Sequence, residues 1–373
     1  MFEKLDTYTL QEYWWLIVAL LGGLLLFLTF VQGGQSKLGM AKNEEQKDLL
    51  INALGRKWEL TFTTLVLFGG ALFAAFPLFY AVSFGGAYAL WMAILFSFII
   101  QAVAFEYRKK PNNFLGQKTY ELFLLINGTI GIFLIGVAIG TLFSGAAFRI
   151  DDMKQMEWLG SMRGLEALAN PFNLLFGLML VFLARLNADF YFIYILGDAD
   201  LVQKARKSLK VDFAIFLVLF LAVAGWILNM QGVGYNAKGF YWVEHKYLKN
   251  FLAMPTLLAL FIAGVVMVLA AVYGALFKNA RRVFWLNSLG VVLVGLSLLL
   301  ILGLNHTAFY PSTADVASSL TIENSSGSRI TLITMSYVSL MVPFVIAYIA
   351  YVWRLMDSKP LSEDEVEHDP MSY

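Results

Sequence analysis

Long apolar runs separated by short polar segments dominate this chain. A helix that crosses a bilayer needs about 20 mostly apolar residues, and nine stretches meet that requirement. We therefore expect an all-α polytopic membrane protein, in which residues 1–356 form a single transmembrane helical domain with nine spans. The expected spans are residues 11–32, 60–83, 86–105, 119–143, 171–196, 211–230, 251–277, 283–304 and 330–355.

The basic residues between these runs predict an orientation. The segments on one side hold 18 of the Lys and Arg residues, and those on the other side hold 8. Lys and Arg are enriched in cytoplasmic loops. We therefore expect the N-terminus outside and the C-terminus in the cytoplasm, and an odd number of spans is consistent with that arrangement.

The polar connections carry three further expectations. The acidic start of segment 44–50 followed by two leucines predicts a short amphipathic interfacial helix. The link between the second and third spans, residues 83–87, is so short that the two helices should be antiparallel neighbours. Residues 357–373 are expected to form an acidic, disordered cytoplasmic tail. Its acids include Glu363, Asp364, Glu365, Glu367 and Asp369.

Composition supports the membrane class and excludes several kinds of chemistry. Hydrophobic residues make up 59% of the chain and charged residues 14%, whereas soluble domains carry about 25% charged residues. The net charge of +1 gives no reason to expect a nucleic-acid partner, so the expected surroundings are the lipid membrane. The chain has no cysteine, which excludes disulfides, thiolate metal sites and iron–sulfur clusters.

The positions of the histidines bear on whether this chain could bind a haem. The three histidines, His245, His306 and His368, lie outside the middle of every expected span. A Met ligand stays open among the 14 methionines, although a dispersed Met in an apolar helix usually serves packing. We expect no metal site in this chain and no redox cofactor bound by it alone.

Two carboxylates at helix ends are the first candidates for function. Glu59 opens the second span and Glu106 closes the third, so the expected hairpin places them at similar depth. Lys110 follows Glu106 by four residues, the spacing of helical neighbours. These residues could form a proton-uptake route, because charges in membrane helices are often functional. They could also simply anchor helix ends, which the spacing alone favours.

The fifth span carries a second set of polar residues. Arg185 and Asp189 are four residues apart and are expected to form a structural ion pair. A lining for a polar cavity is the other interpretation. Asn127 and Asn287 are expected to hydrogen-bond between helices.

Several motifs in register resemble one family. The most specific are residues 51–59 (INALGRKWE), 69–77 (GGALFAAFP) and 104–108 (AFEYR). Shorter matches follow in the same order at residues 170–172, 311–313, 319–321 and 330–332. With these motifs the chain resembles subunit II of the cytochrome bd-type quinol oxidases.

The resemblance implies a haem-free subunit of a quinol oxidase in the bacterial inner membrane. It implies a partner, the haem-bearing subunit I, with haems b and d, where quinol is oxidised and O2 is reduced to water. This chain would stabilise that partner and supply part of the route for cytoplasmic protons. It leaves open a small single-helix subunit, a structural quinone and an oxygen route through this chain.

The resemblance also carries residues over. The family's proton-pathway positions fall on Glu59, Glu106 and Lys110, with Glu where the family commonly has Asp at the first two. It favours the proton route over the anchoring interpretation. The accessory candidates are Trp58, Gln101, Arg108, Arg185 and Asp189.

Four positions depart from the family pattern. Gln32 and Gln35 stand where many members carry acids, and Gln101 stands where an Arg is found. Thr64 replaces a Trp of some members, which leaves the oxygen entrance open. Two alternatives remain at this point: a secondary transporter, which would show an inverted repeat, and a purely structural membrane subunit.

Overall fold

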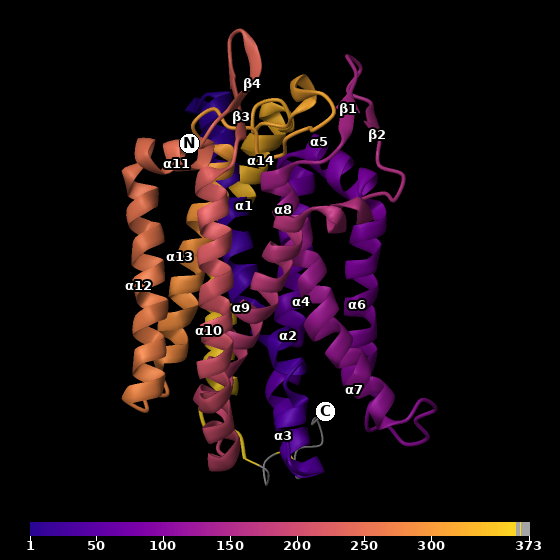
Figure 1. The fold of residues 1–373 in the computed structure, drawn as a ribbon, viewed down its shortest axis with the longest axis vertical. Coiled ribbons are helices and arrows are strands. Elements are labelled where there is room, and N and C mark those ends of the chain that lie inside the picture. Colours follow the sequence, from indigo (N-terminus) through magenta and orange to yellow (C-terminus); the bar gives the residue numbers. More distant parts are fainter. Residues whose placement is uncertain (363–365, 367–373) are drawn as a thin grey trace.

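The structure is a computed structural model that describes residues 1–362 and 366. Within these residues nine helical segments are long and apolar enough to cross a membrane, as expected. Figure 1 shows them as an elongated bundle of upright helices. Their bounds are Thr7–Gln35, Glu44–Ala75, Tyr88–Tyr107, Gln117–Ser144, Pro171–Ile195, Ala199–Asn229, Pro255–Phe277, Val283–Gly303 and Arg329–Met356.

Several spans consist of two consecutive helices. The helices of the bundle are α1 (Thr7–Leu28), α2 (Phe30–Gln35), α3 (Glu44–Gly55), α4 (Trp58–Ala75), α6 (Tyr88–Tyr107), α7 (Gln117–Ile126), α8 (Ile132–Ser144), α9 (Pro171–Ile195), α10 (Ala199–Asn229), α12 (Pro255–Phe277), α13 (Val283–Gly303), α14 (Arg329–Ser339) and α15 (Val342–Met356). Two shorter helices, α5 (Pro77–Tyr80) and α11 (Lys246–Ala253), lie at the end where the N-terminus is found (Figure 1).

Side-chain caps fix where several helices begin. The Asp6 carboxylate accepts a hydrogen bond from Thr9 N at 2.9 Å, just before α1. The Asn170 side chain accepts one from Phe172 N at 2.9 Å, with Pro171 as the first residue of α9. Such caps satisfy backbone N–H groups that have no partner within the helix.

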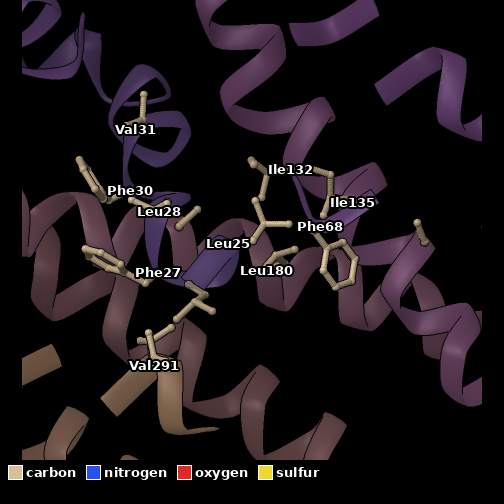
Figure 2. Close-up of a cluster of buried hydrophobic side chains, with 14 of the residues drawn as sticks. Leu25, Phe27, Leu28, Phe30, Val31, Phe68, Ile132, Ile135, Leu180 and Val291 are labelled. Atoms are coloured by element: carbon tan, nitrogen blue, oxygen red, sulfur yellow. The ribbon is translucent and has the colours of Figure 1, made fainter. Parts of the chain in front are cut away.

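The core lies where the first, fifth and eighth spans meet. Figure 2 shows Phe27 and Phe30 near Leu180 and Val291, which come from α1, α2, α9 and α13. Gly33 permits the closest approach, because a Cβ there would lie 1.9 Å from the carbonyl oxygen of Ala184. Glycine therefore lets α2 rest directly on the backbone of α9.

The expectation of an all-α chain needs correction at one end of the bundle. Strand β1 (Phe148–Ile150) pairs antiparallel with β2 (Met156–Trp158), and β3 (Gly232–Asn236) pairs with β4 (Gly239–Val243). Both hairpins lie at the same end in Figure 1. They form in segments expected to be loops, because paired strands satisfy the backbone of these connections.

Helix α3 also differs from its expected form. It extends to Gly55, and Leu49 and Leu50 are fully buried, so it is a packed part of the bundle and not an interfacial helix. A hydrogen bond also ties the α3 backbone to α9: the hydroxyl of Tyr191 donates to Ala53 O at 3.1 Å.

The second and third spans form the expected antiparallel pair. Pro77 ends α4, and a π-helical turn over Ala81–Gly86 leads into α6. Large rings bridge the two helices, with centroid distances of 6.0 Å for Trp58 and Phe105 and 5.8 Å for Phe62 and Phe98. Aromatic contacts therefore set the spacing of this hairpin.

The first residues of the expected tail contact the helical bundle. The Asp357 carboxylate is 1% exposed, lies 2.9 Å from Lys57 Nζ and accepts a hydrogen bond from Trp353 Nε1 at 2.7 Å. Leu361 is fully buried, and its N–H donates to Ile195 O at 2.8 Å. Residues 357–362 therefore belong to the bundle, whereas Glu363, Asp364, Glu365, Glu367 and Asp369 lie outside the described residues.

The segment before the first span and the segment after the last span lie at different ends of the helical bundle. Arg329 donates to Glu3 O at 2.7 Å at one end, and Lys57 pairs with Asp357 at the other. The first and last spans therefore run in the same direction, so that residues 1–6 and 357–362 lie at opposite ends of the bundle. Which side faces the cytoplasm stays a prediction.

Candidate functional site

Glu59 and Glu106 lie at neighbouring helix ends. Glu59 is the second residue of α4, and Glu106 is the penultimate residue of α6. The preceding residues, Trp58 and Phe105, stack with rings 6.0 Å apart and inclined by 14°. The two carboxylates are thus held at similar depth on one rim of the bundle, and both are exposed.

Lys110 does not reach Glu106. Within the described part of the chain these two residues form no ion pair, although their spacing suggested one. Helix α6 ends at Tyr107, and Lys110 N bonds back to Tyr107 O at 3.3 Å in a tighter turn. The spacing rule for helical neighbours fails here because the helix has already ended. Lys110 remains exposed beside the rim.

Arg108 is a buried anchor of this rim. Its guanidinium lies 2.7 Å from Asp48, 2.8 Å from Glu121 and 3.1 Å from Glu44, and its side chain is 1% exposed. These carboxylates come from α3 and α7, so Arg108 ties both helices to the end of α6. A guanidinium with its donors satisfied in this way positions neighbours and does not carry protons, since it stays charged.

The glutamines that depart from the family pattern meet in one place. Gln32 Nε2 and Gln35 Nε2 both donate to Gln101 Oε1, at 2.8 and 2.5 Å. All three side chains are buried. The cluster is neutral, and an amide does not titrate near neutral pH. The three glutamines therefore form one neutral, hydrogen-bonded cluster. Thr64 is separate, and its hydroxyl bonds to Leu60 O of its own helix at 2.6 Å.

We predict that Gln101→Leu destabilises the protein by about 1–3 kcal/mol, because it removes the acceptor of two buried amides. Turnover per assembled complex should be unchanged. The measurement is the melting temperature of the purified complex, compared with that of Gln117→Leu at the exposed start of α7. Equal melting temperatures for the two variants would contradict the role of this cluster.

Four charged side chains form a second cluster, in which Lys37, Asp189 and Asp212 are buried and Arg185 is 27% exposed. Lys37 Nζ lies 2.6 Å from Asp189 Oδ1 and also pairs with Asp212. Arg185 Nε lies 3.0 Å from Asp212 Oδ1. Ser208 joins the cluster, because its hydroxyl accepts a hydrogen bond from Lys37 Nζ at 2.8 Å.

The expected Arg185–Asp189 pair is therefore wrong. Each of these residues instead pairs with a charge from another segment: Arg185 with Asp212 of α10, and Asp189 with Lys37 after α2. No sequence pattern identifies Lys37 or Asp212 as partners, because each lies at the polar edge of an apolar run. The cluster joins α9, α10 and the segment after α2. An ion pair within α9 alone would join none of them.

The expected asparagine contacts are confirmed. Asn287 Nδ2 donates to Asn187 Oδ1 at 2.8 Å between α13 and α9. Asn127 Nδ2 donates to Ser97 Oγ at 3.2 Å. Both are helix–helix contacts within the core.

The described residues contain no group of three His, Cys, Asp or Glu side chains that could hold a metal ion. His245 lies between β4 and α11, and His306 follows α13, so neither is inside a span. The absence of a redox cofactor in this chain stays a prediction.

Fold and sequence define a multi-pass helical membrane protein with charged and polar clusters between its helices. Residues 10–356 match the family model described as "Cytochrome bd terminal oxidase subunit II". The chain belongs to this family, and it is thus one subunit of a respiratory oxidase complex.

Curated relatives agree along the whole chain. It is 28% identical to "Cytochrome bd-I ubiquinol oxidase subunit 2" of Escherichia coli (strain K12), over 96% of this chain and 97% of that protein. It is 25% identical to "Cytochrome bd ubiquinol oxidase subunit 2" of Bacillus subtilis (strain 168), over 98% and 99%.

A solved structure shares the fold. One chain in the bd oxidase from Geobacillus thermodenitrificans matches with a TM-score of 0.65 and 14% identity, over 93% of this chain and 98% of that chain. At this identity the likeness concerns the arrangement of helices only.

Proposed function

We propose that this chain is the haem-free subunit of a quinol oxidase, and that cytoplasmic protons enter the complex at Glu59 and Glu106. The observation that carries the proposal is the position of these exposed carboxylates on one rim, joined by the Trp58–Phe105 ring stack. Exposed carboxylates exchange protons with water and can pass them to a neighbouring acceptor.

The route continues in the partner subunit. Helices α4 and α6 expose apolar side chains beside the rim, including Val66, Leu67, Phe96 and Ile99. We assign this face to the haem-bearing subunit, so that protons leaving Glu59 and Glu106 enter the partner directly.

The neutral Gln32–Gln35–Gln101 cluster supports an entry at the rim. It lies between α2 and α6 and contains no titratable side chain of its own. In this protein the acids of α4 and α6 are therefore the groups that would take up protons.

The proposed complex oxidises quinol and reduces O2 to water in the bacterial inner membrane. The haems b and d belong to the partner, and they supply the electron transfer and oxygen chemistry when bound there. This chain stabilises that partner and contributes the proton entrance. A purely structural subunit without an entrance of its own is the alternative.

Co-purification tests the assignment. We expect a complex isolated through an affinity tag on this chain to show haem absorption bands. The bands should disappear when the gene for the partner is deleted, while this chain is still produced. Haem bands in the chain purified without its partner would contradict the proposal.

A further inference from the structure

A pocket of about 400 Å3 lies where α10 begins and α12 ends. Figure 1 places this region at the end of the bundle opposite the two hairpins. The polar side chains of its lining come from Arg206, Arg281, Gln203 and Asn279, and no carboxylate belongs to the lining. Two positively charged side chains thus share one cavity.

Both arginines are held in place by backbone carbonyls. Arg206 donates to Ala275 O and, at 3.0 Å, to Asn279 O, near the end of α12. Arg281 donates to Ile193 O at 3.0 Å and to Leu196 O, near the end of α9. A guanidinium has five N–H donors, so these contacts fix each group and leave further donors for a ligand.

Neither arginine has an acidic partner within the described residues. This distinguishes them from Arg108 and Arg185, which are each paired with carboxylates. The carboxylates nearest in sequence are engaged elsewhere: Asp198 caps Leu201 N at 2.7 Å, and Asp200 pairs with Lys42 and Lys204. Two guanidinium groups in one cavity repel each other, and a bound anion offsets that repulsion.

The surroundings indicate which anion fits. A stripe of exposed apolar side chains runs along α12 and includes Ile262, Val266, Leu269, Tyr273 and Phe277, the last of which precedes the pocket residue Asn279 by two positions. Lys207 and Lys278 are exposed beside the pocket region. An apolar stripe that ends at a basic pocket matches an acyl chain joined to an acidic headgroup, and basic pockets between transmembrane helices bind such headgroups.

We propose that this pocket binds the phosphate of an anionic phospholipid, with one acyl chain along the exposed face of α12. Capping of helix ends by Arg206 and Arg281 accounts for part of their geometry. It does not account for their convergence on one cavity whose lining, among the described residues, contains no carboxylate. In Figure 1 this site and the α4–α6 face lie on opposite sides of the bundle, so the site does not depend on the proposed proton entrance.

The test uses the assembled oxidase after delipidation in detergent. The complex is mixed with dioleoylphosphatidylglycerol, dioleoylphosphatidylcholine or inorganic phosphate, and the bound molecules are counted by native mass spectrometry. We expect retention of phosphatidylglycerol over phosphatidylcholine. The double variant R206Q/R281Q should lower this retention about tenfold or more, because charge-assisted hydrogen bonds are lost.

Lys207→Gln is the matched control, since it removes a neighbouring exposed charge that does not line the pocket. It should leave retention unchanged. If R206Q/R281Q fails to assemble, R206K/R281K keeps both charges without the forked donors and should show weaker but measurable retention.

Four results would overturn the proposal. These are equal retention of both lipids, unchanged retention in the double variant, an equal loss in Lys207→Gln, and displacement of phosphatidylglycerol by inorganic phosphate at the same concentration. The last result would assign the pocket to a free anion.

Discussion

Replacing Glu59 by Gln is expected to slow oxygen consumption by the assembled oxidase roughly 10- to 100-fold, at the lower end of what positioned proton-transfer groups contribute. The effect should stay at that lower end because Glu106 lies on the same rim and can still take up protons. Subunit content and haem absorption per complex should be unchanged, since Glu59 is exposed and supports no buried contact.

Two control variants make this result specific. Glu45→Gln removes another exposed carboxylate, which accepts a hydrogen bond from Asn43 Nδ2 at 2.8 Å, and it should keep normal turnover. Glu59→Asp retains the acid and should recover most of the lost rate. Wild-type turnover in Glu59→Gln would refute the proton entrance at Glu59 and favour a purely structural role for this subunit.

Lys37→Met is expected to lower the free energy of unfolding by about 3–5 kcal/mol, the usual cost of removing one partner from a buried ion pair. Asp212 would keep Arg185, but Asp189 would lose the cation beside it. The measurement is the loss of monodisperse complex on heating, followed by size-exclusion chromatography.

The exposed pair of Lys42 and Asp200 provides the comparison. Its side chains are 67% and 37% exposed, against 1% and 0% for Lys37 and Asp189. Lys42→Met should therefore change stability by about 1 kcal/mol at most. The double variant K37M/D189N should regain part of the loss, because the uncompensated carboxylate is gone. Equal thermal stability of Lys37→Met and Lys42→Met would disprove the structural role of the cluster.

The spans could be predicted from the sequence because burial in lipid demands long apolar runs, whatever the neighbours are. The expected span 171–196 agrees with α9 (Pro171–Ile195) to within one residue. The depth of Glu59 and Glu106 also followed from the sequence, because a short connection leaves little freedom to a hairpin.

Contacts between distant segments could not be predicted in the same way. Arg185 and Asp189 have the spacing of a helical pair, yet each finds a better partner on another helix. Which helix supplies the partner of a charged residue depends on how the helices pack. The spacing of residues along one helix carries no information about that packing. The expected contact between Lys110 and Glu106 was wrong for a local reason: α6 ends at Tyr107, before it reaches Lys110.

The pairing of Lys57 with Asp357 has a consequence for biogenesis. One partner lies near the beginning of the chain and the other near its end. During synthesis this pair can form only after the last helix has been made, because Asp357 follows it in the chain. A chain truncated before Asp357 would therefore leave the Lys57 ammonium group without this carboxylate.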